Sequence, residues 1–163
     1  MNIVLIGMPG CGKSTVGVLL AKSMLRDFVD TDLIIQNKYK KSLCDIINQE
    51  GLNAFKKKEN TVLRELRVKN SVIATGGSAV YCDEGMENLK KDGKIIYLRL
   101  SPLTIKSRIK NITTRGIAMA PDCTIDDLYE ERSVLYEKYA DIIIDAEGLS
   151  AEETVNKIME LAL

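Results

Sequence analysis

The sequence contains no histidine. Histidine is the side chain that most often acts as a general base near neutral pH, and it is the commonest metal ligand. Its absence excludes the usual histidine-based mechanisms. Any proton transfer or metal binding by this chain must therefore rely on carboxylates and cations.

An excess of charge of either sign is also lacking, because Lys and Arg together number 23 and Asp and Glu together number 23. A balanced chain creates no net field that attracts nucleic acid or an anionic membrane surface. We therefore expect a small-molecule partner, with neither nucleic acid nor membrane.

Long hydrophobic runs and paired cysteines are missing as well. The first apolar run ends at Gly7 and is too short for a signal-peptide core or a membrane span, so we expect a cytoplasmic protein. The cysteines lie far apart and form no C-x-x-C pair, which argues against a zinc site and a disulfide framework. The thiols expected to stay reduced are Cys11, Cys44, Cys82 and Cys123.

The length of 163 residues suits one domain with a hydrophobic core, so we assign residues 1–163 to a single domain. Short runs rich in Ile and Val alternate with helical patterns, which predicts an α/β fold with a parallel sheet flanked by helices. The expected strands are Ile3–Ile6, Phe28–Val29, Ser71–Thr75, Lys94–Leu100 and Asp141–Ile144. The expected helices are Lys13–Leu25, Leu33–Tyr39, Leu43–Val68 with a break near Gly51, Glu84–Lys91, Pro102–Lys110, Ile125–Tyr139 and Ala151–Leu163.

A phosphate-binding loop is indicated by Gly7-Met8-Pro9-Gly10-Cys11-Gly12-Lys13-Ser14, which matches G-x-x-x-x-G-K-[ST] (Walker A) between a strand and a helix. Its glycines let backbone N–H groups surround phosphate oxygens, and the helix N-terminus adds its positive end. We expect Lys13 to reach the β- and γ-phosphates of ATP and Ser14 to ligate Mg²⁺. The alternative is a chance glycine-rich turn. The residues expected to bind ATP here are Gly10, Cys11, Gly12, Lys13, Ser14 and Thr15.

Two carboxylates, Asp30 and Asp32, follow the second expected strand. In open α/β sheets the ligand crevice lies beyond the carboxyl ends of the strands, so both side chains could face it. One would serve the metal and its waters, and the other a substrate hydroxyl. Asp32 could instead, or in addition, cap the helix that starts at Leu33.

These segments resemble the shikimate kinase family, small ATP-dependent enzymes of the nucleoside-monophosphate-kinase-like group. The resemblance spans nearly the whole chain and implies a three-layer α/β/α fold with five parallel strands in the order 2-3-1-4-5. It also implies a substrate-binding segment at residues 33–61, a lid at 111–124 and a monomer. The segments that carry it are Gly7–Thr15, Asp30/Asp32, Gly51–Glu59, Ala74–Gly77 and Arg132–Asp141.

The resemblance further implies roles for individual residues. Asp32 would contact the shikimate hydroxyls and accept a proton, while Asp30 would join Ser14 at the metal. Arg108 would stack near the adenine, and Arg115 in the lid would approach the transferring phosphoryl group. The residues that would bind shikimate are Asp32, Lys56, Glu59, Gly76, Gly77 and Arg132.

Some of these residues also have simpler explanations. Arg132 could form a surface salt bridge with Glu130 or Glu131. The lysines at 56–58 could form the solvated face of a helix.

Departures from the family pattern fall in three segments, which include Gly51-Leu52, the turn Gly76-Gly77-Ser78 and Arg115-Gly116-Ile117-Ala118. Lys56 stands where the family usually has arginine, and it offers a carboxylate a point charge in place of a bidentate fork. Ser78 replaces the third glycine of a turn, where it could clash with the ligand or add a contact. In the lid, Gly116 replaces proline, which makes a closed loop entropically costlier.

We therefore expect a Mg²⁺-dependent kinase that transfers the γ-phosphate of ATP to a hydroxyl of shikimate. The alternatives are a kinase for another small hydroxy acid or polyol, and a nucleotide-binding module without kinase activity. A GTP-dependent switch is disfavoured, because no Asn-Lys-x-Asp stretch follows the loop.

Overall fold

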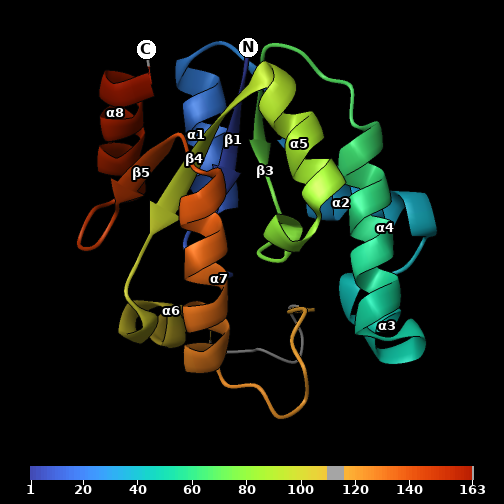
Figure 1. Ribbon diagram of the computed structural model, residues 1–163. Helices are drawn as coiled ribbons and strands as arrows, with labels where there is room; N and C mark the ends of the chain where they lie inside the picture. Colours follow the sequence, from blue (N-terminus) through green and yellow to red (C-terminus); the bar gives the residue numbers. More distant parts are fainter. Residues whose placement is uncertain (110–115, 163) are drawn as a thin grey trace.

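The fold is built on a five-stranded parallel sheet in the order β2-β3-β1-β4-β5 (Figure 1). A computed structural model describes residues 1–109 and 116–162. The α/β class and the strand order are confirmed. The strands are β1 (Asn2–Ile6), β2 (Asp27–Asp30), β3 (Ser71–Ala74), β4 (Gly93–Arg99) and β5 (Ile142–Asp145).

Helices cover both faces of this sheet. α1 and α8 pack together on one face, and α5 and α7 pack on the other (Figure 1). A short 3₁₀ helix, η1 (Ala79–Tyr81), was not predicted. The α-helices are α1 (Lys13–Ser23), α2 (Thr31–Tyr39), α3 (Leu43–Glu50), α4 (Leu52–Glu65), α5 (Asp83–Asp92), α6 (Pro102–Arg108), α7 (Ile125–Tyr139) and α8 (Ala151–Ala162).

The central strands form the core because both of their faces are covered. Every residue of β1 and β3 is buried, as their unbroken apolar runs predict for a parallel sheet flanked by helices. β1 lies between β3 and β4, so the loop that follows β1 emerges at the middle of the carboxyl edge of the sheet. The most favourable place for a ligand in such a fold is therefore occupied by the predicted phosphate loop.

Helices α2, α3 and α4 form a subassembly beside the sheet with a small core of its own (Figure 1). The predicted break near Gly51 separates α3 from α4, because this residue has a φ of +87° that ends a helix cheaply only in glycine. Ala118, which follows the undescribed segment, packs into the same core. The buried residues of this cluster are Ile35, Leu43, Ile46, Phe55, Val62 and Ala118.

The described helices were also searched for membrane spans. None of them is long and apolar enough to cross a bilayer.

Candidate active site

The loop between β1 and α1 is shaped by its glycines. Gly10 and Gly12 have φ values of +79° and +98°, which side chains oppose. Gly7 has a φ of +146°, and a Cβ atom there would lie 2.7 Å from the backbone oxygen of Leu98. The backbone of the loop is thus held in a conformation that suits a ring of inward-facing N–H groups.

Lys13 is folded back over this loop. Its ammonium group donates hydrogen bonds of 2.7 Å to the carbonyl of Gly7 and 2.9 Å to that of Met8, and only 7% of the residue is exposed. A buried ammonium group that faces a cavity is a fixed positive charge for an anionic ligand. This arrangement would suit the phosphates of a nucleotide.

Asp30 connects the loop to the second strand. One of its carboxylate oxygens accepts a 2.9 Å hydrogen bond from the hydroxyl of Ser14, and the other accepts from the N–H groups of Asp32 and Leu33. Asp30 is therefore the N-cap of α2, and the prediction that Asp32 caps this helix is wrong. The helix begins at Thr31, two residues earlier than expected, which leaves the Asp32 carboxylate available for another role.

Ser14 and Asp30 offer the ligand types that Mg²⁺ prefers, a hydroxyl and a carboxylate oxygen. Within residues 1–109 and 116–162, no group of three or more His, Cys, Asp or Glu side chains could hold a metal by itself. A magnesium ion at this position therefore fits only as one that shares phosphate oxygens and water, which is its usual binding mode.

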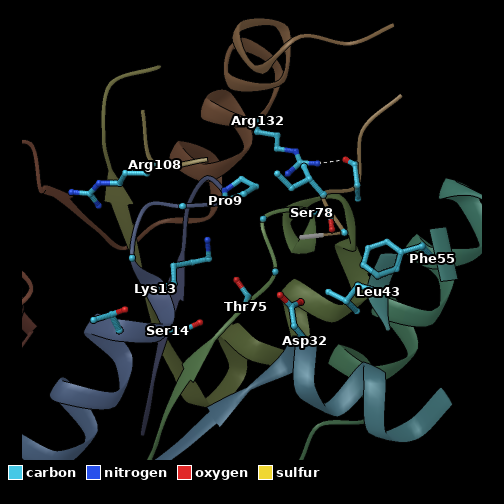
Figure 2. A pocket seen from close by; sticks show the side chains of 18 residues that line it. Pro9, Lys13, Ser14, Asp32, Leu43, Phe55, Thr75, Ser78, Arg108 and Arg132 are labelled. Atoms are coloured by element: carbon cyan, nitrogen blue, oxygen red, sulfur yellow. Dashed lines mark hydrogen bonds between the residues drawn. The ribbon is translucent and has the colours of Figure 1, made fainter. Parts of the chain in front are cut away.

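A cavity of about 450 Å³ extends from the loop to the start of α2 and the turn after β3 (Figure 2). Lys13 and Ser14 lie at one end, and Asp32, Ser78 and Arg132 lie around the other (Figure 2). The predicted site residues that line it are Gly10, Gly12, Lys13, Ser14, Thr15, Asp32, Gly76, Gly77, Arg108 and Arg132.

Two buried carboxylates meet beside Gly76. A Cβ atom on this glycine would lie 2.8 Å from Oδ1 of Asp32 and 2.7 Å from Oε1 of Glu59. Both of these oxygens are buried and have no hydrogen-bond partner among the described residues. Because unpaired buried acceptors are costly, this pair is suited to a ligand that donates hydroxyl groups.

The two carboxyl groups have raised pKa values. Burial, the nearby charge of Asp30 and the opposing charge of Lys13 give Asp32 a pKa of about 6. Burial raises the pKa of Glu59 to about 7, against a hydrogen bond from Ser78, and the charge of Asp32 adds to the rise. A carboxylate whose pKa lies near 6 or 7 can take up a proton during a reaction at neutral pH.

Arg132 supplies the cation at this end of the cavity. It is 1% exposed, so the alternative of a surface salt bridge with Glu130 or Glu131 is wrong. Its Nη2 atom donates to the carbonyl of Ala118, and its Nε is buried without a partner among the described residues (Figure 2). The guanidinium group thus keeps a free donor for an anionic ligand.

Besides Asp30, three predicted site residues in the described part of the chain do not line this cavity. Lys56 does not line it, because its ammonium group lies over the ring of Tyr81, 4.1 Å from the centroid. Cys11 is buried, with its sulfur 3.7 Å from the Lys13 ammonium nitrogen. Glu59 lies behind the wall, where it accepts a 2.6 Å hydrogen bond from the Ser78 hydroxyl.

The predicted lid is described only from Gly116 onward, and Arg115 lies outside the described residues. Gly116 packs closely on the start of α3, since a Cβ atom there would lie 2.8 Å from the backbone nitrogen of Cys44. Ile117 and Ala118 line the cavity. Residues 116–118 therefore form the part of the cavity wall that lies next to α3.

Sequence reasoning missed most of the apolar wall. Leu43 and Phe55 close the side formed by α3 and α4, Pro9 lies within the loop, and Thr75 lies beside the loop (Figure 2). Apolar side chains at helical spacing are indistinguishable from ordinary core residues in a sequence. Thr75 could have been suspected, because it immediately precedes the glycines of the turn.

Comparisons with known proteins agree with this geometry. The sequence profile of the family described as "Shikimate kinase" matches residues 9–162. The chain is 42% identical to a shikimate kinase of Thermodesulfovibrio yellowstonii over 98% of its length and 93% of that protein. The chain belongs to the shikimate kinase family.

Solved structures of shikimate kinases superpose on the whole chain. The enzyme of Acinetobacter baumannii in complex with shikimate has a TM-score of 0.91 and 32% identity, and covers 99% of this chain and 92% of its own. The enzyme of Aquifex aeolicus has a TM-score of 0.84 and 35% identity, with coverages of 98% and 95%. The expected family is confirmed.

Proposed function

We propose that this chain transfers the γ-phosphate of ATP to a hydroxyl of shikimate, giving shikimate 3-phosphate and ADP. The observation that carries the proposal is one continuous cavity lined by the phosphate loop and by Asp32, whose Oδ1 atom has no partner among the described residues, in a member of the shikimate kinase family. We also propose that residues 1–163 form one kinase domain and act as a monomer, a proposal supported by the lining of the cavity within a single chain. A cytoplasmic location is proposed with it, because ATP and small metabolites are available there.

ATP with Mg²⁺ supplies the phosphoryl group and neutralises part of the charge on the phosphate oxygens. Gly10, Gly12 and Thr15 bind the phosphates around Lys13, whose ammonium group offsets the charge that develops on transfer. Ser14 and Asp30 would hold the metal. Arg108 lines the nucleotide side of the cavity, and Cys11 contributes through its backbone.

Asp32 orients the acceptor hydroxyl and takes its proton as the new oxygen–phosphorus bond forms and the bond to ADP breaks. Its pKa of about 6 leaves it ionised at neutral pH and basic enough for this step. Glu59, Gly76 and Gly77 shape the acceptor pocket next to it, where the two glycines allow the side chains of Asp32, Glu59 and Arg132 to approach the backbone closely.

The carboxylate of the acceptor is bound by Arg132, whose planar fork suits bidentate pairing. That Lys56 also binds this carboxylate stays a prediction. Its ammonium group would have to leave the ring of Tyr81 to reach the pocket. Arg115, in the undescribed part of the lid, is proposed to meet the transferring phosphoryl group on closure and to exclude water with the lid.

The proposal is tested by the release of ADP from MgATP in the presence and absence of shikimate. We expect shikimate to stimulate ADP release far above the rate of ATP hydrolysis. The assay is repeated with other acceptors, namely quinate, gluconate and several polyols. The ammonium group of Lys56 lies over Tyr81, which leaves one cation fewer for a substrate carboxylate. This observation favours a second candidate function, a kinase for another hydroxy acid. Stimulation by one of these and not by shikimate would contradict the acceptor assignment, and no stimulation by any would favour an inactive module.

The activity is expected to depend on the ionisation of the two carboxylates. The pKa values of Asp32 and Glu59, about 6 and about 7, lie well above those of ordinary carboxyl groups. Because the protonated forms cannot accept a hydroxyl proton, kcat/KM for shikimate should be constant at higher pH and fall as the pH drops from 7 to 6. An acid limb near pH 4 would contradict these assignments.

Replacement of Gly76 with alanine is expected to raise KM for shikimate about tenfold or more, with little change in KM for ATP. The new methyl group would lie within 2.8 Å of both Asp32 Oδ1 and Glu59 Oε1, so one carboxylate must move. Gly51→Ala is the matched control, since its methyl group would meet no atom within 4 Å. It should cost about 1 kcal/mol of stability through its positive φ and leave KM for shikimate unchanged. Equal KM values in both variants would refute this geometry.

A further inference from the structure

Ser78 lies between Gly77 and η1, with only 3% of the residue exposed. Its φ of −89° and ψ of −4° lie in the right-handed helical region, so the backbone does not require glycine at this position. Its hydroxyl donates a 2.6 Å hydrogen bond to Oε2 of Glu59. The serine therefore adds a contact, one made with a neighbouring carboxylate.

This hydrogen bond places the two oxygens of Glu59 in different environments. Oε2 is occupied by Ser78, whereas Oε1 is buried and unpartnered among the described residues. Oε1 lies on the Gly76 side, where Oδ1 of Asp32 is also unpartnered. Oε1 of Glu59 and Oδ1 of Asp32, the proposed base, therefore both lie beside Gly76.

We propose that Ser78 is a positioning residue for the acceptor: its hydroxyl fixes Glu59 so that Oε1 accepts a hydrogen bond from an acceptor hydroxyl beside Asp32. The inference rests on the proposed function and gives a task to the residue that interrupts the expected three-glycine turn. Glycine at this position would leave Oε2 without its donor. The carboxylate would then lose a constraint on its side-chain torsions, and the productive orientation would be less populated.

Charged or titratable groups face Glu59 from several elements. Burial and the charge of Asp32 raise its pKa, while the hydrogen bond from Ser78 opposes this rise. Loss of the Ser78 hydroxyl should therefore raise the pKa of Glu59 and move the acid limb of activity to higher pH. The other groups that act on Glu59 or feel its charge are Lys56 on α4, Cys82 after η1 and Arg132 on α7.

The test compares Ser78→Ala and Ser78→Thr with the parent chain, each assayed with varied shikimate and varied ATP across pH 5 to 9. Ser78→Ala is expected to raise KM for shikimate about tenfold, as loss of a hydrogen bond to a charged acceptor does, and to leave KM for ATP unchanged. Its acid limb should move to higher pH. Ser78→Thr retains the hydroxyl and should keep both KM for shikimate and the acid limb of the pH profile near the parent values. Ser23→Ala, at the exposed end of α1, controls for loss of a serine elsewhere.

The outcomes separate this inference from the proposed function. A Ser78→Ala chain with an unchanged KM for shikimate and an unchanged pH profile overturns the inference. A rise in both KM values with no movement of the acid limb, or a failure of threonine to rescue a folded chain, shows a merely structural role and overturns it too. A parent chain that does not phosphorylate shikimate overturns the proposed function itself.

Discussion

Replacing Asp32 with asparagine is expected to lower kcat about a thousandfold and to raise the melting temperature of the chain. The loss of activity follows from the loss of the proton acceptor, a contribution that is typically about 100- to 10,000-fold. The gain in stability follows from the pKa, which rises from 3.8 to about 6 on folding because burial disfavours the charge. At neutral pH the ionised group therefore destabilises the fold by about 3 kcal/mol, and the amide removes this cost.

The pH dependence of the stability difference identifies its cause. Asp32 binds its proton more tightly in the folded chain, so its unfavourable contribution is complete above pH 6 and disappears as the pH falls toward 4. The melting temperatures of parent and Asp32→Asn should accordingly differ at pH 8 and converge near pH 4. Asp27→Asn, at the exposed start of β2, the strand that precedes α2, is the control and should affect neither activity nor melting temperature. A destabilised Asp32→Asn chain with ordinary turnover would contradict both assignments.

Replacing Lys13 with methionine is expected to reduce kcat/KM for ATP at least about a thousandfold, or about 4 kcal/mol of transition-state stabilisation. Methionine keeps the apolar stem but removes the charge that faces the cavity. It also leaves the carbonyls of Gly7 and Met8 without their donor, so the loop itself loses a constraint. Initial rates with varied MgATP at saturating shikimate measure the effect.

Lys22→Met provides the matched control for this variant. Lys22 lies in the last turn of α1, exposed and outside the cavity, so its replacement should leave kcat/KM for ATP within about twofold. If Lys13→Met retained the ATP affinity and turnover of the parent, the loop could not be the phosphate site.

Much of the fold was predictable, because its strands are short, strongly apolar and separated by well-signalled helices. The expected helix at Pro102 begins there, where Ser101 is the N-cap, and the break at Gly51 separates two helices. The ends of the helices were predicted less accurately. The expected helix ran to Val68, whereas α4 stops at Glu65. The helix η1 is three residues long, which is too short to show a helical period in the sequence. It forms where the chain turns from β3 into α5.

The site was predictable where a motif fixes the backbone and unpredictable where tertiary contacts decide. The loop and Asp32 follow from local patterns at the carboxyl ends of two strands. The pairing of Ser78 with Glu59 joins residues 19 apart, and no local signal records it. The position of Lys56 over Tyr81 likewise depends on how α4 packs against η1. Side-chain direction on an amphipathic helix was therefore the main source of uncertainty.

A crystal structure of the chain with ADP and shikimate tests the central claim most directly. The account predicts the phosphates of ADP within the loop Gly7–Ser14, one shikimate hydroxyl within hydrogen-bond distance of Asp32, and the shikimate carboxylate against Arg132. Shikimate bound with all its hydroxyls away from Asp32, or a nucleotide bound outside the loop, would contradict it.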